Sequence, residues 1–197
     1  MKFLPSRCCI AIRPSALLFT LAALCAAASP HAQNAPLAVG STAEVAFSPR
    51  GGAQALVVRL IDSARTSIRL AAYAFTSPAV TRALIAAKKR GVDVAVLVDH
   101  KSNLVQDASG KATAALNALS LAGVATATVS RYPIHHDKYI VVDQAHVETG
   151  SFNFSNAAEF GNSENVLVLW NSPQVARAYL AHWASRSAAS VPYRPGF

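Results

Sequence analysis

The sequence predicts an α/β fold in which a mixed β-sheet carries helices on both faces. Segments with strand character alternate with segments of helical periodicity along most of the chain. The run at 92–98 is apolar apart from Asp93, which is typical of a strand covered on both faces. Two later strand segments, 139–142 and 146–149, are separated by a short turn and predict an antiparallel hairpin. The hairpin makes the predicted sheet mixed.

The first part of the chain has the composition of a secretory signal peptide. An apolar run over residues 16–28 is followed by small residues that suit a signal peptidase. It is preceded by three positively charged residues, Lys2, Arg7 and Arg13. A transmembrane anchor is the alternative, but the run is shorter than the roughly 20 residues that span a bilayer. We therefore expect residues 1–32 to be a signal peptide with an approximate cleavage site.

Residues 33–197 are expected to form the folded domain, periplasmic or secreted in a bacterium, with no stable membrane anchor after cleavage. All three cysteines of the chain precede residue 33, so disulfide bonds do not stabilise this domain. Cleavage would remove three positive charges and no negative ones, which lowers the formal net charge from +8 to +5. A basic domain suits a polyanionic partner, either a nucleic acid or an anionic membrane surface.

The strands and helices follow one another in regular order from residue 43. Besides the hairpin, strand character marks the segments 43–47, 67–75, 92–98, 124–129 and 166–170. Helical spacing of apolar residues marks the segments 54–65, 78–90, 112–122 and 173–187. Ser77 and Pro78 form a good helix start, and Gly91 forms a good stop. The polar segments 99–111 and 154–163 are expected to be loops.

A composition that is 52% hydrophobic and 14% charged fits one globular domain and excludes a disordered chain.

The stretch from His136 to Asn153 carries the predicted chemistry. It reads H-x-K-x4-D-x6-G-S-x-N, with its defining positions at His136, Lys138, Asp143, Gly150, Ser151 and Asn153. Because side chains alternate along a strand, His136 and Lys138 are expected to share one face, and Ser151 and Asn153 another. A nucleophile, a cation and neutral donors placed together predict an oxyanion-binding site. No cluster of side chains with clear metal-ligand spacing competes with it, so neither a metal nor another cofactor is expected.

This pattern resembles the HKD signature of the phospholipase D superfamily. The run VETGSFNFS at 147–155 and the run NSEN at 162–165 are most similar to the small bacterial Nuc-type endonucleases of that superfamily. The resemblance extends over residues 44–183. It implies the phospholipase D/nuclease-like fold in a chain that carries a single copy of the motif.

The resemblance implies a phosphodiesterase that works without metal through a covalent phosphohistidine. His136 would attack phosphorus, while Lys138 and Asn153, helped by Ser151, would hold the non-bridging oxygens. Glu164 matches a carboxylate that orients a catalytic histidine in the family, by the logic of acyl-transfer triads. The alternative for Glu164 is a plain structural position ahead of the next strand.

Asp143 and Gly150 complete the signature and are assigned supporting roles. Turn chemistry indicates that Asp143 secures the hairpin and carries no proton. His135 is expected to point away from the face that His136 occupies. His182 has no motif around it and is interpreted as an ordinary core or surface histidine.

The mechanism implied by the resemblance requires two histidines, one that attacks and one that protonates the leaving oxygen. This chain has one motif, and short members of the family assemble a single site across a homodimer. A two-fold axis supplies the second copy of His136 automatically. The sequence therefore predicts a homodimer.

The favoured function is a metal-independent endonuclease without sequence specificity, acting on DNA or RNA. The basic charge and the Nuc-like runs support this choice, and no segment has the pattern of an element that reads bases in a groove. One alternative is a lipid phosphodiesterase of the phospholipase D type, because the same chemistry applies to any phosphodiester. Another is a noncatalytic module that binds polyanions.

Overall fold

The predicted alternation of strands and helices is present in the computed structural model, which describes residues 34–196. The predicted signal peptide lies outside the described residues. The strands are β1 (Thr42–Ser48), β2 (Ser67–Ala72), β3 (Asp93–Asp99), β4 (Ala125–Val129), β5 (Tyr139–Val142), β6 (His146–Gly150), β7 (Glu164–Trp170) and β8 (Ser190–Pro192). The helices are α1 (Ala53–Ser63), α2 (Pro78–Lys89), α3 (Lys111–Leu121), α4 (Asn156–Phe160) and α5 (Pro173–Ser187), with one π-helical turn, η1 (Lys101–Val105).

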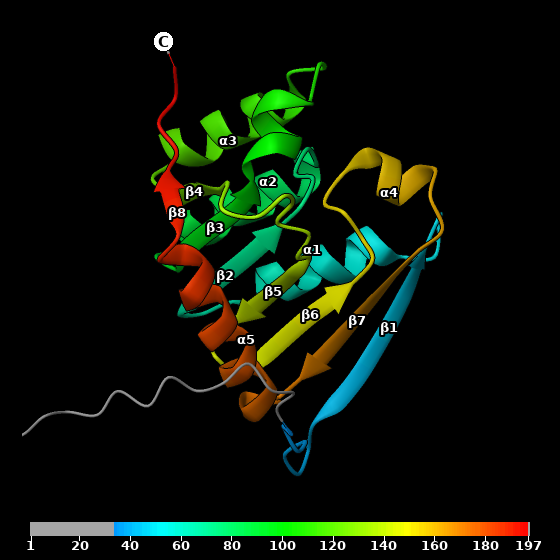
Figure 1. Ribbon diagram of the computed structural model, residues 1–197. Coiled ribbons are helices and arrows are strands. Elements are labelled where there is room, and N and C mark those ends of the chain that lie inside the picture. Colours follow the sequence, from blue (N-terminus) through cyan, green and yellow to red (C-terminus); the bar gives the residue numbers. More distant parts are fainter. Residues whose placement is uncertain (1–33, 197) are drawn as a thin grey trace, which may run out of the picture. The chain divides into compact units, whose positions relative to one another are not determined.

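The strands form one mixed sheet in the order β1-β7-β6-β5-β2-β3-β4-β8 (Figure 1). Strands β2, β3 and β4 run parallel to one another, and every other neighbouring pair is antiparallel. The parallel part comes from strands joined through helices, and the antiparallel part includes the predicted hairpin of β5 and β6. The mixed sheet predicted from the sequence is therefore confirmed.

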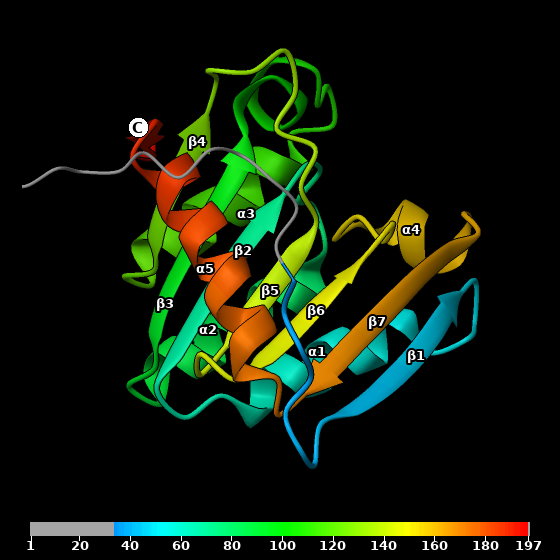
Figure 2. The same ribbon diagram turned by 60° about the horizontal axis from the view of Figure 1, so that its bottom comes forward.

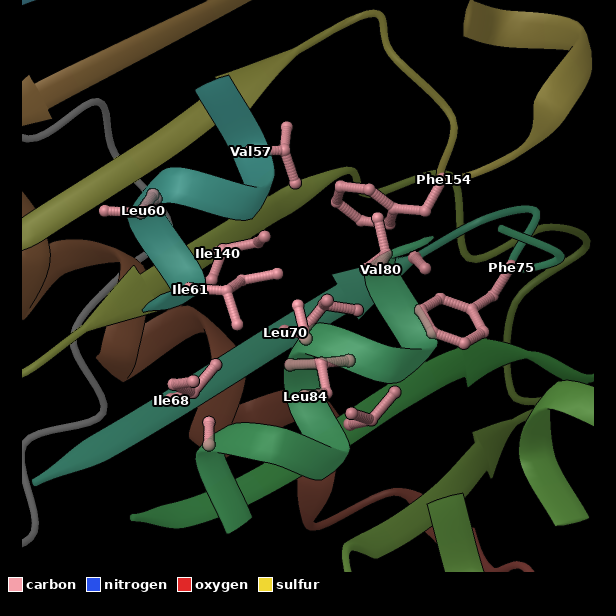
Figure 3. Close-up of a cluster of buried hydrophobic side chains, with 14 of the residues drawn as sticks. Val57, Leu60, Ile61, Ile68, Leu70, Phe75, Val80, Leu84, Ile140 and Phe154 are labelled. Carbon is pink, nitrogen blue, oxygen red and sulfur yellow. The ribbon is translucent and has the colours of Figure 1, made fainter. Parts of the chain in front are cut away.

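Helices cover both faces of this sheet, as predicted. On one face, α1, α2 and α3 contribute to the larger apolar cluster, part of which is shown in Figure 3. On the other face, α5 packs on a smaller cluster that includes Ala71, Tyr139 and Val141. Successive residues of β5 alternate between the two clusters, as the pleat of a strand requires.

Local sequence signals explain the bounds of α2. The Ser77 hydroxyl accepts a hydrogen bond from the Val80 amide at 3.3 Å, and Pro78 occupies the first helical position. Gly91 follows the last turn with φ of 91°, a conformation that glycine adopts without strain.

Three elements differ from the prediction because their residues carry weak local signals. The segment expected as a loop at 99–111 contains the turn η1, and the segment expected as irregular at 154–163 contains α4. Strand β8 was not predicted, since it has only three residues and adds to the sheet edge beside β4. Among residues 34–196, no helix has both the length and the apolar character needed to cross a membrane.

A buried carboxyl group interrupts the larger apolar cluster. Glu148 of β6 is fully buried between its cross-strand neighbours Ile140 and Val168, and neither carboxyl oxygen has a hydrogen-bond partner among the described residues. Burial raises the pKa of Glu148 to about 8. The side chain is therefore a neutral acid in the folded protein at neutral pH.

We predict that Glu148 makes the protein less stable as the pH rises. Between pH 4.5 and about 8 the unfolded chain ionises this group and the folded protein does not. The folded state then binds more protons, so the free energy of unfolding falls by up to about 1.4 kcal/mol per pH unit. Urea unfolding across this range should show the slope in the wild type and lose it in Glu148→Gln. The exposed Asp62→Asn variant serves as control, and an unchanged slope in Glu148→Gln would contradict the prediction.

Candidate active site

The motif gathers where the ends of four neighbouring strands of the sheet meet. Register pairs Ala71 with Tyr139, Tyr139 with Thr149, and Thr149 with Leu167. The end of β2, the start of β5, the end of β6 and the start of β7 therefore lie side by side. This antiparallel arrangement brings together segments of the chain that are far apart in sequence.

His136 and Lys138 lie just before β5 and line the same cleft, although the segment that carries them is not itself a strand. His136 is exposed, whereas Lys138 is buried. The Lys138 ammonium donates a hydrogen bond to the His136 carbonyl at 3.0 Å. Both side chains line one cleft, as the predicted shared face requires, and the Lys138 ammonium is tied to the backbone of His136.

Tyr73 joins the two motif side chains and was not identified from the sequence. Its ring lies 4.6 Å from the His136 ring, centre to centre, and the Lys138 ammonium lies 5.3 Å from the centre of the same ring. Tyr73 directly follows β2, at the carboxyl end of a parallel strand, where functional side chains are often found. That position was the available signal.

The electrostatic setting keeps Lys138 poorly solvated. Burial lowers the pKa of its ammonium group, and the carboxylates of Glu164 and Asp137 oppose this effect. An ammonium ion with few competing water molecules interacts strongly with an anion in the cleft.

Gly150 allows β6 and β7 to approach closely beside the motif. A Cβ atom at this position would lie 2.1 Å from the Asn165 carbonyl oxygen, which is too close for any other residue. The supporting role predicted for Gly150 thus has a steric basis, because only glycine fits here without moving the backbone.

Ser151 is bound to Glu164 and Asn165. Its hydroxyl donates to the Glu164 carboxylate at 2.5 Å and accepts from the Asn165 amide at 3.1 Å. Glu164 also accepts a hydrogen bond from the Asn162 side chain at 2.9 Å. Within one chain, none of the hydrogen bonds of the described residues joins Glu164 to His136, so the predicted orienting contact is not made inside a single subunit.

Asn153 is held near the same strand ends by the segment that follows β2. Its side-chain oxygen accepts a hydrogen bond from the Ala74 amide at 3.4 Å. The Phe154 carbonyl accepts from the amides of Thr76 and Ser77, both at 2.8 Å. These bonds fasten the end of the motif to the chain next to Tyr73.

Two buried polar residues support this arrangement: Asp99, which ends β3, and Asn103, which follows it. The Asn103 side chain accepts from the Phe75 amide at 2.9 Å and donates to the Tyr73 carbonyl at 2.6 Å. The Asp99 carboxylate accepts from the His135 amide at 2.6 Å. Sequence reasoning placed both residues in a polar stretch after a buried strand but assigned them no role.

Asp137 connects the motif to α5. Its carboxylate lies 2.9 Å from Nε2 of His182 and 3.3 Å from Nδ1 of His135. His135 is buried, as its predicted direction away from His136 allows, and burial lowers the pKa of its imidazole while Asp137 and Asp99 oppose this. His182, which was interpreted as an ordinary histidine, lies beside the motif.

The cleft itself has a volume of about 510 Å³. It is lined by His136, Asp137, Lys138, Tyr139, Thr149, Gly150, Ala178, Tyr179 and His182. Ser151 and Asn153 lie next to it in the chain but are not among its lining residues. In the described part of the chain, no group of three or more His, Cys, Asp or Glu side chains is arranged to hold a metal ion.

Asp143 occupies the hairpin turn and binds the loop between α1 and β2. It has φ of 52°, and its carboxylate accepts the amides of Arg65, Thr66 and Ser67 at 2.8 to 2.9 Å and the Thr66 hydroxyl at 2.9 Å. Burial would raise the pKa of Asp143, but these hydrogen bonds together hold it below its usual value. The contacts agree with the predicted structural role.

Comparisons with known proteins place this fold and this cleft among the hydrolases that act on phosphodiester bonds. Residues 57–185 match the family model described as "Cardiolipin synthase, PLD-like domain". The phospholipase D of Rickettsia bellii is 38% identical over 148 residues, which are 75% of this chain and 70% of the relative.

Solved structures agree with this match. The phospholipase D family member Nuc from Salmonella typhimurium is 47% identical, with a TM-score of 0.75 over 78% of this chain and 99% of that one. NucT from Helicobacter pylori has 20% identity and a TM-score of 0.67 over 78% and 99% of the two chains, which shows a shared fold. The chain belongs to the phospholipase D superfamily.

We predict that removing the Asp143 carboxylate destabilises the protein by about 1–3 kcal/mol, because the four hydrogen bonds that this charged group accepts from the 65–67 segment are lost together. Asp143→Asn keeps one acceptor oxygen and tolerates the left-handed conformation, so it should lose less than Asp143→Ala. Since the pKa of Asp143 is lowered, its contribution is present above the usual value of 3.8 and is lost as the pH falls through the folded-state pKa. Urea unfolding of both variants measures this, and equal losses would contradict the role of the retained oxygen.

Proposed function

We propose that this protein is a metal-independent endonuclease without sequence specificity, which cleaves DNA or RNA through a covalent phosphohistidine. The observation that carries this proposal is the placement of His136 and Lys138 in one cleft, within a motif that matches Nuc-type endonucleases. The 47% identity to Nuc supports the same choice.

The reaction divides into two balanced steps. His136 attacks phosphorus, the bond from phosphorus to the leaving oxygen breaks, and the partner's His136 gives that oxygen a proton. The partner's His136 then takes a proton from water, and the resulting hydroxide displaces the first imidazole from phosphorus. Lys138 and Asn153, helped by Ser151, hold the non-bridging oxygens, which replaces the charge stabilisation that a metal would supply.

The exposed face beside the motif supports a site shared by two subunits. Figure 2 shows α5 crossing the sheet over β2 and β5, with β7 and β1 beyond its edge. On the part of this face that α5 leaves uncovered, strand register places Thr149, Leu167 and Val45 in one row across the sheet. The next row along β1 has Phe47 opposite Asn165. Val45 is 60% exposed and Phe47 is 57% exposed. An apolar surface next to an incomplete site suits a second copy of the chain.

In such a dimer Glu164 has a defined task. It already holds Ser151, and none of the hydrogen bonds of the described residues joins it to His136 of its own chain, so we assign it the orientation of a catalytic histidine across the interface. Residues 1–32 act as a signal peptide in this proposal, and residues 33–197 work in the periplasm or outside the cell.

A lipid phosphodiesterase is the second candidate function. The Rickettsia relatives carry the name phospholipase D, which favours it. The cleft chemistry serves either substrate, so the two candidates differ in what binds around the phosphorus. The two candidates are distinguished by the rates at which one preparation cleaves plasmid DNA and phosphatidylcholine vesicles when the two substrates compete.

The direct test is cleavage of plasmid DNA by the purified protein in excess chelator. We expect cleavage to persist, and His136→Ala to reduce it to background, because one acid or base typically contributes about 10²–10⁴-fold and this change removes two roles. Lys138→Ala should cause a severe loss of cleavage activity, and the adjacent His135→Ala should cause only a mild one. Cleavage that requires an added divalent ion would refute the metal-free mechanism, and a stronger loss in His135→Ala than in His136→Ala would refute the assignment.

A second test addresses the shared site. Phe47→Asp places a charge on the exposed face of β1, so we expect a monomer by light scattering and activity near background, because a monomer lacks the second histidine. Val191→Asp on the opposite edge strand, at a residue that is 60% exposed, is the matched control and should remain dimeric and active. A monomeric but fully active Phe47→Asp protein would exclude a shared site.

A further inference from the structure

The catalytic cleft continues along α5 into a second hollow. This hollow has a volume of about 160 Å³ and shares His136, Asp137 and His182 with the cleft. Tyr132 and Arg186 line its far end. The two spaces form a trough that is larger than one phosphate group requires.

Helix α5 forms one wall of this trough. Ala178, His182 and Arg186 recur every four residues, so they form one stripe on the helix. Ala178 and His182 line the cleft, and His182 and Arg186 line the hollow. Consecutive members of the stripe are separated by slightly more than one helical turn, or about 6 Å along the axis.

Both polar side chains of the stripe are held in place by neighbours. Nε2 of His182 donates to the Asp137 carboxylate at 2.9 Å, which leaves Nδ1 free of hydrogen bonds with the described residues. Asp137 is the residue between His136 and Lys138, so this bond sets His182 directly against the motif. A fixed side chain binds a ligand with less loss of conformational entropy than a mobile one.

Arg186 is fixed in a similar way but keeps its charge uncompensated. It donates to the Tyr132 hydroxyl at 2.6 Å, and its guanidinium lies 4.8 Å from the centre of that ring. None of the ion pairs among the described residues includes Arg186. The remaining N–H groups of a positioned guanidinium are suited to phosphate oxygens.

We propose that His182 and Arg186 form a subsite for the phosphates that neighbour the scissile one in a polynucleotide. The inference rests on the proposed function and names the part of the chain that recognises a polymeric substrate. A polynucleotide places one phosphate after another along the trough, which two polar side chains one turn apart can contact. A lipid diester presents apolar chains to this same wall, where the charge of Arg186 opposes their burial.

The first experiment compares a polymeric substrate with a minimal one. Single-stranded oligothymidylate and bis(4-nitrophenyl) phosphate share the scissile group, but only the polymer reaches the subsite. We expect His182→Gln and Arg186→Gln each to lower the ratio of kcat/KM on the polymer to kcat/KM on the small diester by about tenfold, the loss of one hydrogen bond to a charged group. The effect should lie in KM, and Arg186→Lys should recover part of it.

Arg177→Gln is the matched control. Arg177 is an exposed cation of the same helix that lines neither the cleft nor the hollow, so its removal should leave the ratio unchanged. Equal losses of kcat/KM on the polymer and on the small diester would show that His182 and Arg186 have only structural roles, and would overturn the subsite. Equal losses on oligothymidylate and on phosphatidylglycerol vesicles would show a general anion site and overturn the preference for a polynucleotide.

The second experiment does not depend on catalysis. Binding of oligothymidylate to the His136→Ala protein is measured over a range of salt concentrations. Loss of one phosphate contact should reduce the slope of log K against log salt by about 0.7 for a single strand. We expect this reduction with Arg186→Gln and not with Arg177→Gln, and an unchanged slope with Arg186→Gln would overturn the subsite. If the wild type cleaves neither substrate, the proposed function fails, and the slopes still decide the subsite.

Discussion

The site depends on one buried amide, the side chain of Asn103. It is 1% exposed and bonds to the backbone of Tyr73, Phe75 and Asp99. It therefore ties the segment after β2 to the end of β3, and Asp99 in turn holds the backbone of His135, next to His136. Such a fully satisfied buried group is favourable, while the same group without partners would cost several kcal/mol. The position of the imidazole relative to Tyr73 follows from this network.

The antiparallel half of the sheet then brings residues from both ends of the motif to one cleft. Because the start of β5 lies beside the end of β6, His136 and Lys138, which precede β5, line one cleft with Thr149 and Gly150 at the end of β6. The same register leaves the outer face of β7 and β1 without a helix, since α5 covers only the strands nearer the centre. In the proposed dimer, a single two-fold interface would both cover that apolar face and supply the second copy of His136 that the proposed mechanism requires.

Charge burial has opposite outcomes at two places in this fold. Lys138 is buried at the edge, where the carboxylates of Glu164 and Asp137 favour its charged form. Glu148 is buried in the apolar cluster with no such neighbour, so it is held neutral. The sequence pattern does not separate these cases, because both residues lie in segments with strand character. Only the neighbours across the sheet decide which group keeps its charge.

The sequence by itself determined the fold class, the order of the long elements, and the family, because these depend on periodicity, helix caps and a motif with fixed spacing. Helix α2 begins after Ser77 and ends before Gly91 as its signals indicate. The short elements α4, η1 and β8 escaped prediction because tertiary contacts outweigh their weak local preferences. Tertiary structure alone brought Tyr73, Asn103 and His182 to the motif, since contacts between residues 30 or more positions apart leave no periodic trace in the chain.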